Sequence, residues 1–413
     1  MILSDIKIEV YPALEGDCFL IRMNDQKKTN ILIDGGFSET YHDYLKPRLL
    51  QMAKNGEELS LVIVTHVDQD HIEGIIELFN ENGTADDPKV IPIKEVWHNS
   101  YRHLNFLNQK KEEELDKNEI SILNGITSQS SIIKSERNNE PNKDISAKDG
   151  STLAGLLYGG KYNWNRLFDG SAINCDEKAY ISLTSEINIY LLSPNSEKLK
   201  KLEKTWIKEL RKSKYDFKLN ESKIFDDAYE YYLLSLHDEN EANESKDISG
   251  RQEKISLDNL LKKKLSSDNS VVNGSSISFI LEYKQYKLLF LADAHPNIIR
   301  ENIQKLVSNQ ECNPFFDMIK VSHHGSYRNT SVELLSLIDS PIYLFSTNGR
   351  QNEHPNMETL ARIISRKSIK RRLVFNYPIS NEILLDEALK RNYCFTTDFS
   401  NGQQIKVIEI QKG

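Results

Sequence analysis

Short runs of apolar residues, each ending in polar residues, recur through the first hundred positions of the chain. Some runs alternate apolar and polar side chains, which is typical of a half-buried strand. Others are almost wholly apolar, which is typical of a strand buried on both faces. The pattern predicts strands at residues 6–12, 17–23, 31–33 and 59–64, with helices at 38–55 and 72–79.

The same organisation returns in the second half of the chain. Residues 277–282 and 286–291 flank a short polar turn and predict a hairpin, and further strands are expected at 316–321 and 341–345. Several strands in both halves end in polar or metal-binding residue types. Because α/β proteins gather site residues from distant sequence at one edge of a sheet, we expect an α/β fold with a site at the strand ends.

The middle of the chain is more polar and more helical than either end. We interpret two parts of it, residues 100–172 and 195–270, as helical insertions, the second of them rich in charge. A strand at 186–194 separates them. Within the insertions, helices are predicted at 110–126, 153–168, 197–212 and 224–237, and polar loops at 136–148 and 237–254.

Composition limits the location and the partners of the protein. The 413 residues include 53 lysines and arginines against 61 acidic residues, a net charge of −8, which disfavours a protein that coats nucleic acid. We interpret the basic clusters at 198–204 and 366–372 as solvated surfaces. The four cysteines are scattered without a CxxC pair, which indicates a reducing compartment. With no signal-peptide pattern and no apolar run near the ~18 residues that span a bilayer, we expect a cytoplasmic protein without a membrane segment.

The segment Thr65–Gly74 carries the strongest chemical signal. It places four metal-capable side chains within six residues, directly after a predicted buried strand: His66, Asp68, Asp70 and His71. A second cluster, Asp293 with His323 and His324, also stands at predicted strand ends. Alternate residues of an extended loop project to the same side, and imidazole with carboxylate suits zinc, iron or manganese. The two clusters therefore predict a metal site.

These residues resemble the metallo-β-lactamase superfamily. The likeness runs in chain order through Asp34, the HxHxDH-like loop at 66–71, Asp293 and a histidine at 323–324. It implies one domain over residues 1–413, folded as a four-layer αβ/βα sandwich, and leaves the helical insertions unexplained. A closer likeness, to the hydrolase domain of ComEC-like DNA-uptake proteins, is carried by Gly16–Ile21, Asn273–Ser276, Leu291–Ala294, Val321–Ser326, Asn352–Pro355 and Thr396–Asp398.

Two positions depart from the family pattern. Asp68 stands where the family has its second histidine, so a carboxylate replaces an imidazole at the first metal position. The resemblance implies one or two Zn²⁺ ions, and this exchange makes Mn²⁺ or Fe²⁺ an alternative. The family's third histidine has no secure counterpart. His98 is the best-placed residue for it, and the alternative is that His98 is a polar residue of the pocket wall.

The resemblance also implies roles for the individual side chains. Asp293 would bridge two ions, with Asp70, His71 and one of His323 or His324 on one ion and with His66 and Asp68 on the other. A bound ion would activate water as the nucleophile, and Asp34 would orient a ligand without binding metal. Asp70 and His354 are the candidate catalytic residues, and His354 is either a contact to a substrate phosphate or leaving group or a turn residue before Pro355. Ser326 and Asn348 are candidate hydrogen-bond donors on the same rim.

The resemblance favours hydrolysis of a phosphodiester, as in a phosphodiesterase or nuclease. The acidic net charge disfavours long duplex DNA, so a small phosphodiester, a nucleotide or a short single strand is expected. The same chemistry would also hydrolyse a carbonyl substrate such as a lactam, lactone, thioester or peptide. A third hypothesis is that the protein is a partner-dependent component of a multi-protein defence cassette. In that case residues 100–172 or 195–270 would bind another protein.

Overall fold

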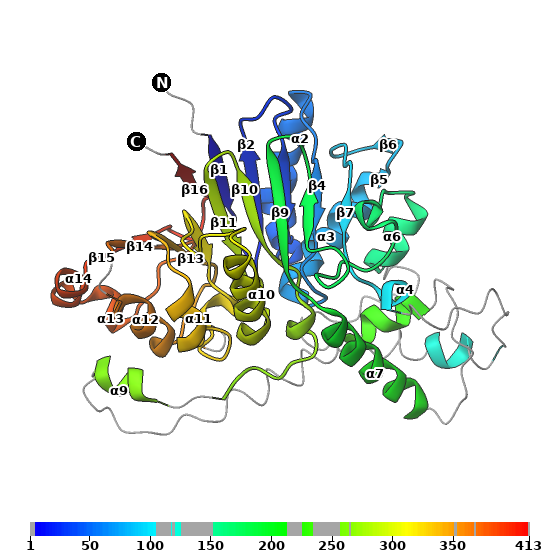
Figure 1. Cartoon of the computed structure of the whole chain (residues 1–413). Helices are drawn as coiled ribbons and strands as arrows, with labels where there is room; N and C mark the ends of the chain where they lie inside the picture. The colour runs from blue at the N-terminus through cyan, green and yellow to red at the C-terminus, as the bar shows by residue number, and fades with distance from the viewer. Residues whose placement is uncertain are drawn as a thin grey trace, which may run out of the picture.

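Apolar strands assemble into two large sheets in the computed structural model of this chain (Figure 1). The structure describes residues 5–104, 117, 120–124, 152–212, 225–233, 257–263, 266–350, 353–366 and 369–411. A six-stranded sheet is built mainly from the first hundred residues, and an eight-stranded sheet is built from residue 180 onward. A separate two-stranded ribbon pairs β5 (Gly83–Thr84) with β6 (Asp87–Pro88).

The six-stranded sheet has the order β16-β1-β2-β3-β4-β7. On one side of the sheet β16, β1, β2 and β3 pair antiparallel in turn, whereas on the other side β3, β4 and β7 run parallel. The last strand of the chain therefore completes the N-terminal sheet. The strands are β1 (Ile6–Val10), β2 (Phe19–Met23), β3 (Asn30–Ile33), β4 (Leu61–Ile63), β7 (Val96–Trp97) and β16 (Lys406–Ile410).

The eight-stranded sheet has the order β15-β14-β13-β12-β11-β10-β9-β8. Strands β8 to β11 pair antiparallel, and β11 to β15 pair parallel. The carboxyl ends of β11, β12 and β13 therefore meet at one edge. The strands are β8 (Tyr180–Ser182), β9 (Ile187–Ser193), β10 (Ser278–Tyr283), β11 (Tyr286–Phe290), β12 (Met318–Lys320), β13 (Ile342–Phe345), β14 (Arg371–Phe375) and β15 (Phe395–Phe399).

Helices connect the strands and cover the outer faces of both sheets. The α-helices are α1 (Ser38–Thr40), α2 (Lys46–Lys54), α3 (Gln69–Asn82), α4 (Tyr101–Leu104), α6 (Leu153–Gly159), α7 (Ser196–Lys212), α9 (Leu257–Lys262), α10 (Pro296–Ser308), α11 (Val332–Leu337), α12 (Met357–Ile364), α13 (Glu382–Leu385) and α14 (Glu387–Tyr393). A π-helical segment, η1 (Tyr41–Leu45), joins α1 to α2. Short 3₁₀ turns are η2 (Arg166–Phe168), η3 (Asn273–Ser275) and η4 (His323–Gly325).

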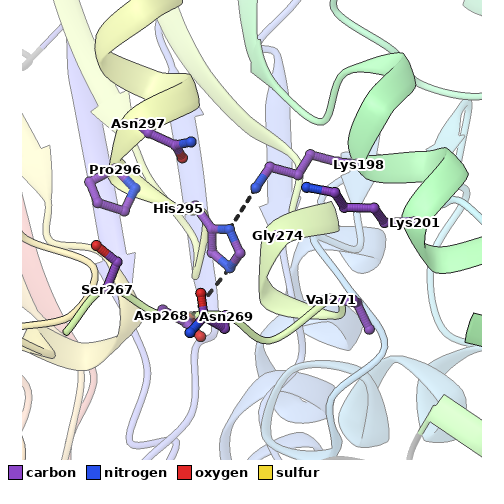
Figure 2. A pocket seen from close by; sticks show the side chains of 10 residues that line it. All are labelled: Lys198, Lys201, Ser267, Asp268, Asn269, Val271, Gly274, His295, Pro296 and Asn297. Carbon is purple, nitrogen blue, oxygen red and sulfur yellow. Dashed lines mark hydrogen bonds and ion pairs between the residues drawn. The ribbon is translucent and has the colours of Figure 1, made fainter.

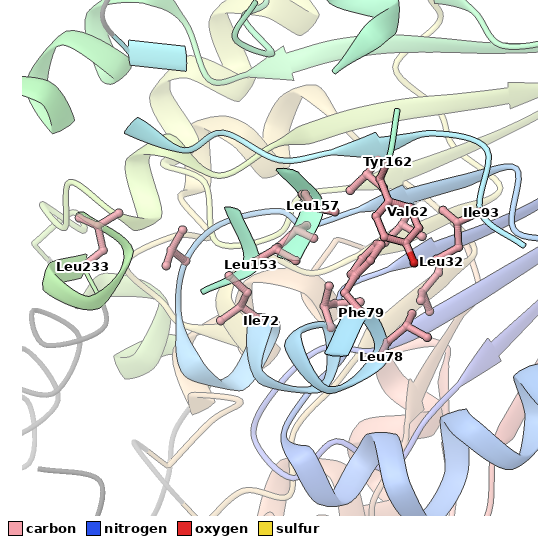
Figure 3. Close-up of a cluster of buried hydrophobic side chains, with 14 of the residues drawn as sticks. Leu32, Val62, Ile72, Leu78, Phe79, Ile93, Leu153, Leu157, Tyr162 and Leu233 are labelled. Atoms are coloured by element: carbon pink, nitrogen blue, oxygen red, sulfur yellow. The ribbon is translucent and has the colours of Figure 1, made fainter. Parts of the chain in front are cut away.

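Three buried apolar clusters define four layers. One cluster joins strand residues of both sheets, such as Ile21 and Leu281, and fills the space between them. A second packs α2, α3 and α6 against the six-stranded sheet, with Phe79 and Leu153 among its members (Figure 3). A third packs α10, α11 and α12 against the eight-stranded sheet. The mixed α/β fold is thus a helix–sheet–sheet–helix sandwich, which confirms the expected fold class and is consistent with the metallo-β-lactamase fold.

The described parts of the two helical regions pack on each other. Arg102 of α4 donates its guanidinium hydrogen bonds to Asp226 of the helical residues 225–233. The rings of Tyr101, Trp206 and Tyr229 lie within 6.5 Å of one another, measured between centroids. Segments far apart in sequence therefore form one helical region beside the six-stranded sheet. Among the described residues, every helix is too short or too polar to cross a membrane.

Every strand expected from the sequence is present, although most are shorter than predicted. The prediction of a helix over residues 153–168 is wrong, because α6 ends at Gly159 and only the turn η2 follows. The pair Gly159-Gly160 explains this end, since glycine is a poor helix former. The helix predicted at 197–212 is confirmed as α7. The loops at 136–148 and 237–254 and most of the predicted helix at 110–126 lie outside the described residues.

Candidate metal centre

Seven metal-capable side chains meet where strands of both sheets end, and we call this set the candidate metal centre. The β4 strand leads to His66 and to α3, β11 leads to Asp293, and β12 leads to the His323-His324 turn. Parallel pairing of β11 with β12 places their carboxyl ends side by side. The set consists of His66, Asp68, Asp70, His71, Asp293, His323 and His324, and all of them are buried except His323, which is partly exposed.

The loop after β4 is shorter than the sequence suggested, because α3 begins at Gln69 instead of Ile72. Asp68 is extended at the N-cap position, while Asp70 and His71 lie in the first helical turn. The expectation of four ligands alternating along an extended loop is therefore wrong for Asp70 and His71. The helix N-terminus stabilises the negative charge of Asp70, and consecutive helical positions aim Asp70 and His71 in different directions.

One group of potential ligands consists of His66, His71 and Asp293, whose ligand atoms lie within 4.8 Å of one another. The Asp293 Oδ2 atom is 3.9 Å from His66 Nε2 and 3.8 Å from His71 Nε2. Asp68 adjoins this group, since its Oδ2 atom is 3.1 Å from His66 Nε2. These distances are short enough for one cation to contact all of these atoms after small side-chain shifts.

A second group consists of Asp70, His71 and His324. The Asp70 Oδ2 atom is 3.2 Å from His324 Nε2 and 3.6 Å from His71 Nε2. His71 thus belongs to both groups, whereas the sequence assigned it to one ion only. Asp293 lies between the groups, since its Oδ2 atom is also 3.8 Å from His324 Nε2. The arrangement fits a bridging position for Asp293.

The donor atoms of this centre fit a divalent cation. Within the described part of the chain, His71 Nε2 and Asp293 Oδ1 are buried and have no hydrogen-bond partner. Leaving a buried polar atom unsatisfied costs about 1–3 kcal/mol, so two such atoms facing one centre require an explanation. A cation held by imidazole nitrogen and carboxylate oxygen would satisfy both.

Charge in the centre is balanced between histidines and carboxylates. Burial alone would lower the pKa of His71, but Asp70, Asp293 and Asp34 outweigh it and raise the pKa to about 10. Burial alone would raise the pKa of Asp293, but the surrounding histidines hold it well below its ordinary value. A bound divalent cation would take the place of the histidine protons, because metal-ligating imidazole is neutral.

Asp34 lies behind the centre and holds one of its residues, His71, together with the neighbouring Thr65. Its carboxylate accepts hydrogen bonds from the Thr65 backbone N–H (2.7 Å), the Thr65 hydroxyl (2.7 Å) and His71 Nδ1 (2.8 Å). The hydrogen bond from His71 Nδ1 to Asp34 leaves His71 Nε2 directed at the centre. The geometry agrees with the orienting role that the sequence suggested, since a carboxylate behind a histidine ligand fixes its ring and its tautomer.

We predict that Asp34→Asn weakens zinc binding about 10- to 100-fold, the range typical for loss of such an orienting partner. The amide would preserve the left-handed backbone at this position, where φ is 54°, but it would remove the carboxylate charge behind His71. Competitive titration of folded protein with a zinc chelator measures the effect. Asp43→Asn, at an exposed aspartate of η1, is the control. Equal zinc affinity in the two variants would contradict the role of Asp34.

His323 and His324 both adopt left-handed backbone conformations, with φ values of 45° and 52°. Such conformations are uncommon outside glycine and indicate that the turn is held in place by its surroundings. His324 Nδ1 donates to the Ser346 carbonyl (2.8 Å), which directs Nε2 toward Asp70. His323 Nε2 lies 3.7 Å from Asp293 Oδ2. The sequence left open which histidine is the ligand, and the fold places both within reach of Asp293.

His98 is not brought into the candidate metal centre. It is fully buried, its Nε2 donates to Glu230 Oε1 at 2.8 Å, and its ring stacks on Trp164. Among the described residues, it belongs to none of the groups whose ligand atoms converge. The suggestion that His98 supplies the missing third histidine is therefore not supported by the geometry, because its ring nitrogen is used within the helical region.

His354 lies against the histidine pair, and its ring centroid is 5.2 Å from that of His323 and 6.4 Å from that of His324. Burial, together with these neighbours, lowers the pKa of His354 well below its ordinary value. A neutral imidazole at this place can donate or accept a hydrogen bond. Ser326 and Asn348 instead cap their own turns, accepting hydrogen bonds from the backbone N–H groups of Arg328 and Arg350.

Sequence reasoning missed the buried ion pair between Asp17 and Lys320, each about 1% exposed. Asp17 Oδ1 is 3.4 Å from His324 Nδ1, so this pair adjoins the centre. Lysine is rarely buried without a partner, and Lys320 inside an apolar strand was the available signal. Glycine at position 16 allows the segment before Asp17 to pack against the backbone of Asp70, because a Cβ at Gly16 would lie 2.0 Å from the Asp70 carbonyl oxygen.

Comparisons with known proteins support the metal-dependent reading. Residues 11–111 match the family model described as "Metallo-beta-lactamase superfamily", which groups mostly metal-dependent hydrolases. Among solved structures, the chain is similar to a mutant of CmlA beta-hydroxylase at 9% identity and a TM-score of 0.34, over 98% of this chain and 54% of the other. The chain thus spans about half the length of that hydroxylase, and this likeness is too low to indicate a function. No curated protein matches the chain.

Proposed function

We propose that this protein is a metal-dependent phosphodiesterase that acts on nucleotides or short single-stranded nucleic acids. The observation that carries the proposal is the buried convergence of imidazole and carboxylate groups in the candidate metal centre. Within each of its two groups of three residues, the ligand atoms lie within 4.8 Å of one another. The match of residues 11–111 to the metallo-beta-lactamase superfamily supports the metal-dependent hydrolase part of the proposal.

The seven side chains of the candidate metal centre would hold one or two divalent cations. A cation held by these residues would lower the pKa of bound water and offset negative charge that develops on the substrate. Zinc suits the donor set, and the carboxylate of Asp68 keeps manganese and iron as alternatives. Elemental analysis of protein purified without chelator would identify the ion.

His354 and Asp70 are the side chains that we propose for proton handling and substrate contact. His354 is buried beside His323, and its lowered pKa keeps it neutral near pH 7. In that form its ring N–H can donate to a phosphoryl or leaving-group oxygen. Asp70 lies at the start of α3 with its carboxylate directed toward His324, where it would hold the cation and accept a proton.

Two features favour a phosphodiester over a carbonyl substrate. Segments such as Gly16–Ile21 and Val321–Ser326 resemble those of ComEC-like hydrolases. In addition, Lys198 and Lys201 line a cavity near the centre, together with His295, and cationic groups favour an anionic substrate. The net charge of −8 disfavours long duplex DNA, which requires many neutralised phosphates.

We expect hydrolysis of bis-p-nitrophenyl phosphate in the presence of zinc or manganese and its loss after chelation. A chromogenic lactam assayed beside it represents the carbonyl alternative. Because the proposed role of the metal contributes several kcal/mol of transition-state stabilisation, chelation should slow the phosphodiester reaction on the order of 10³-fold. Turnover of the lactam alone would overturn the proposal, and turnover unaffected by chelation would overturn its metal dependence.

A further inference from the structure

A cavity of about 270 Å³ lies beside the candidate metal centre. Figure 2 shows the side chains that line it. Its walls come from α7, from the segment that leads into η3, and from the start of α10. Most of the lining residues carry basic or polar side chains, and Val271 and Pro296 are apolar. The lining residues are Lys198, Lys201, Ser267, Asp268, Asn269, Val271, Gly274, His295, Pro296 and Asn297.

The cavity is basic at its α7 side. Lys198 Nζ donates to His295 Nδ1 at 2.7 Å, and because an ammonium group can only donate, His295 carries its proton on Nε2. This Nε2 is buried and lies 3.8 Å from Asp268 Oδ2, and His295 also interacts with the Ser270 backbone. Lys201 also points into the cavity (Figure 2). Its ion pair with Glu197 is largely exposed and therefore weak.

The N-terminus of α10 adds positive potential to the same space. This helix of 13 residues begins at Pro296, with His295 at the N-cap position. No side chain caps it, and its first turn contains no acidic residue. A helix start without a negative partner attracts an anion through its free N–H groups and its dipole. Here that attraction coincides with two lysines.

Asp268 adds one negative charge to the wall, against the two lysines, and neutral donors hold both of its carboxylate oxygens in place. Oδ1 accepts from the Ser270 backbone N–H at 2.8 Å. Oδ2 accepts from Asn273 Nδ2 at 2.9 Å and from Asn329 Nδ2 at 2.8 Å. Asp268 thus fixes the wall of the cavity, while Lys198 and Lys201 supply ammonium donors for a ligand.

Only one layer of side chains separates the cavity from the metal centre. Asp268 Oδ2 is 3.9 Å from His323 Nδ1, and Asn273 Nδ2 is 3.4 Å from the same atom. His295 follows Asp293 by two residues. The cavity and the metal centre are therefore neighbours on the two sides of this wall.

We propose that this cavity binds a second phosphate group of the substrate, next to the phosphate whose ester is cleaved. The inference rests on the proposed phosphodiesterase function and specifies its substrate as a nucleotide or oligonucleotide with at least two phosphates. Phosphate offers several charged acceptor oxygens to ammonium and N–H donors. Lys198 and Lys201 come from α7, within the region that the family resemblance does not cover, so they would confer a specificity particular to this chain.

Direct binding of inorganic phosphate to chelator-treated protein tests the cavity without the metal centre. We expect calorimetric titration to show binding by the wild type, and Lys198→Gln to weaken it about tenfold or more, as for loss of a charge-assisted hydrogen bond. Lys201→Gln should weaken it in the same direction. Lys208→Gln removes the same charge from an exposed position of α7 outside the cavity and should leave binding within about twofold, since only screened long-range charge is lost. Equal affinity in Lys198→Gln and Lys208→Gln would overturn the proposal.

A second experiment compares the hydrolysis of a dinucleotide that carries a 5′-phosphate with that of the same dinucleotide without it. The comparison tells whether the cavity binds a phosphate group of the substrate or only free phosphate. The wild type and Lys208→Gln should prefer the phosphorylated form in kcat/KM, and Lys198→Gln should lose this preference. Phosphate binding without such a preference would mean that the cavity holds only free phosphate and would overturn the substrate subsite. Should the wild type cleave no phosphodiester, the proposed function would fail, and the phosphate titration would still decide whether the cavity binds phosphate.

Discussion

Asp293→Ala is expected to abolish both metal retention and hydrolysis. Asp293 Oδ2 lies within 4 Å of four histidine side chains, His66, His71, His323 and His324, so the substitution removes the only carboxylate that all four approach among the described residues. A bound metal contributes several kcal/mol to stabilising the transition state, which corresponds to a loss on the order of 10³-fold or more in rate. Metal content by elemental analysis and turnover of bis-p-nitrophenyl phosphate measure the two effects.

The matched control for this variant is Asp86→Ala, which removes an exposed aspartate near the β5–β6 ribbon. It should retain metal and activity. His71→Ala should behave as Asp293→Ala does, because His71 belongs to both ligand groups. If either centre variant kept the full metal stoichiometry of the wild type, our assignment of ligands would be wrong.

Lys320→Met is expected to destabilise the fold by about 3–5 kcal/mol, the cost of leaving one member of a buried ion pair alone. Lys320 and Asp17 are each about 1% exposed, and without Lys320 the nearest charged neighbour of Asp17 is His324 Nδ1, 3.4 Å from its Oδ1 atom. The shift of the urea unfolding midpoint, measured on chelator-treated protein, gives the loss in free energy of unfolding. Addition of Asp17→Asn to Lys320→Met should recover much of it, because the uncompensated charge is then removed.

Lys7→Met provides the control for Lys320→Met, since Lys7 pairs with Glu409 on the surface, with side chains 41% and 45% exposed. Such a pair contributes at most about 1 kcal/mol. A loss in Lys320→Met no larger than in Lys7→Met would refute the prediction.

The Asp17–Lys320 pair also sets a pH dependence. Burial alone would raise the pKa of Asp17, but Lys320 and His324 outweigh it and lower the pKa below the ordinary value of 3.8. A carboxyl group whose pKa is lower in the folded state stabilises the fold above its unfolded pKa, and this contribution is lost as the pH falls through the folded value. The difference in stability between wild type and Lys320→Met should therefore shrink below about pH 4.

The sequence by itself determined the strands, the α/β class and most of the candidate ligands. Strand character depends on local patterns of apolar residues, and His66, Asp70, His71 and Asp293 stand in local contexts, directly after such strands, that can be read without the fold. Residues close together in sequence are constrained by the backbone alone. The prediction nevertheless placed the start of α3 three residues late, because side-chain pattern does not show where the first turn closes.

Only the tertiary structure decided how these residues combine. Whether His323, His324 or both reach Asp293 depends on a left-handed turn held by distant partners such as Ser346. His98 lies outside the centre and forms its hydrogen bond with Glu230, which is 132 residues away in the sequence. Contacts of this kind form when the layers pack and exclude water. The free energy lost by burying these polar groups and gained by pairing them depends on neighbours that no local sequence pattern specifies. The basic cavity arises in the same way, because α7 and the start of α10 become neighbours only when the chain has folded.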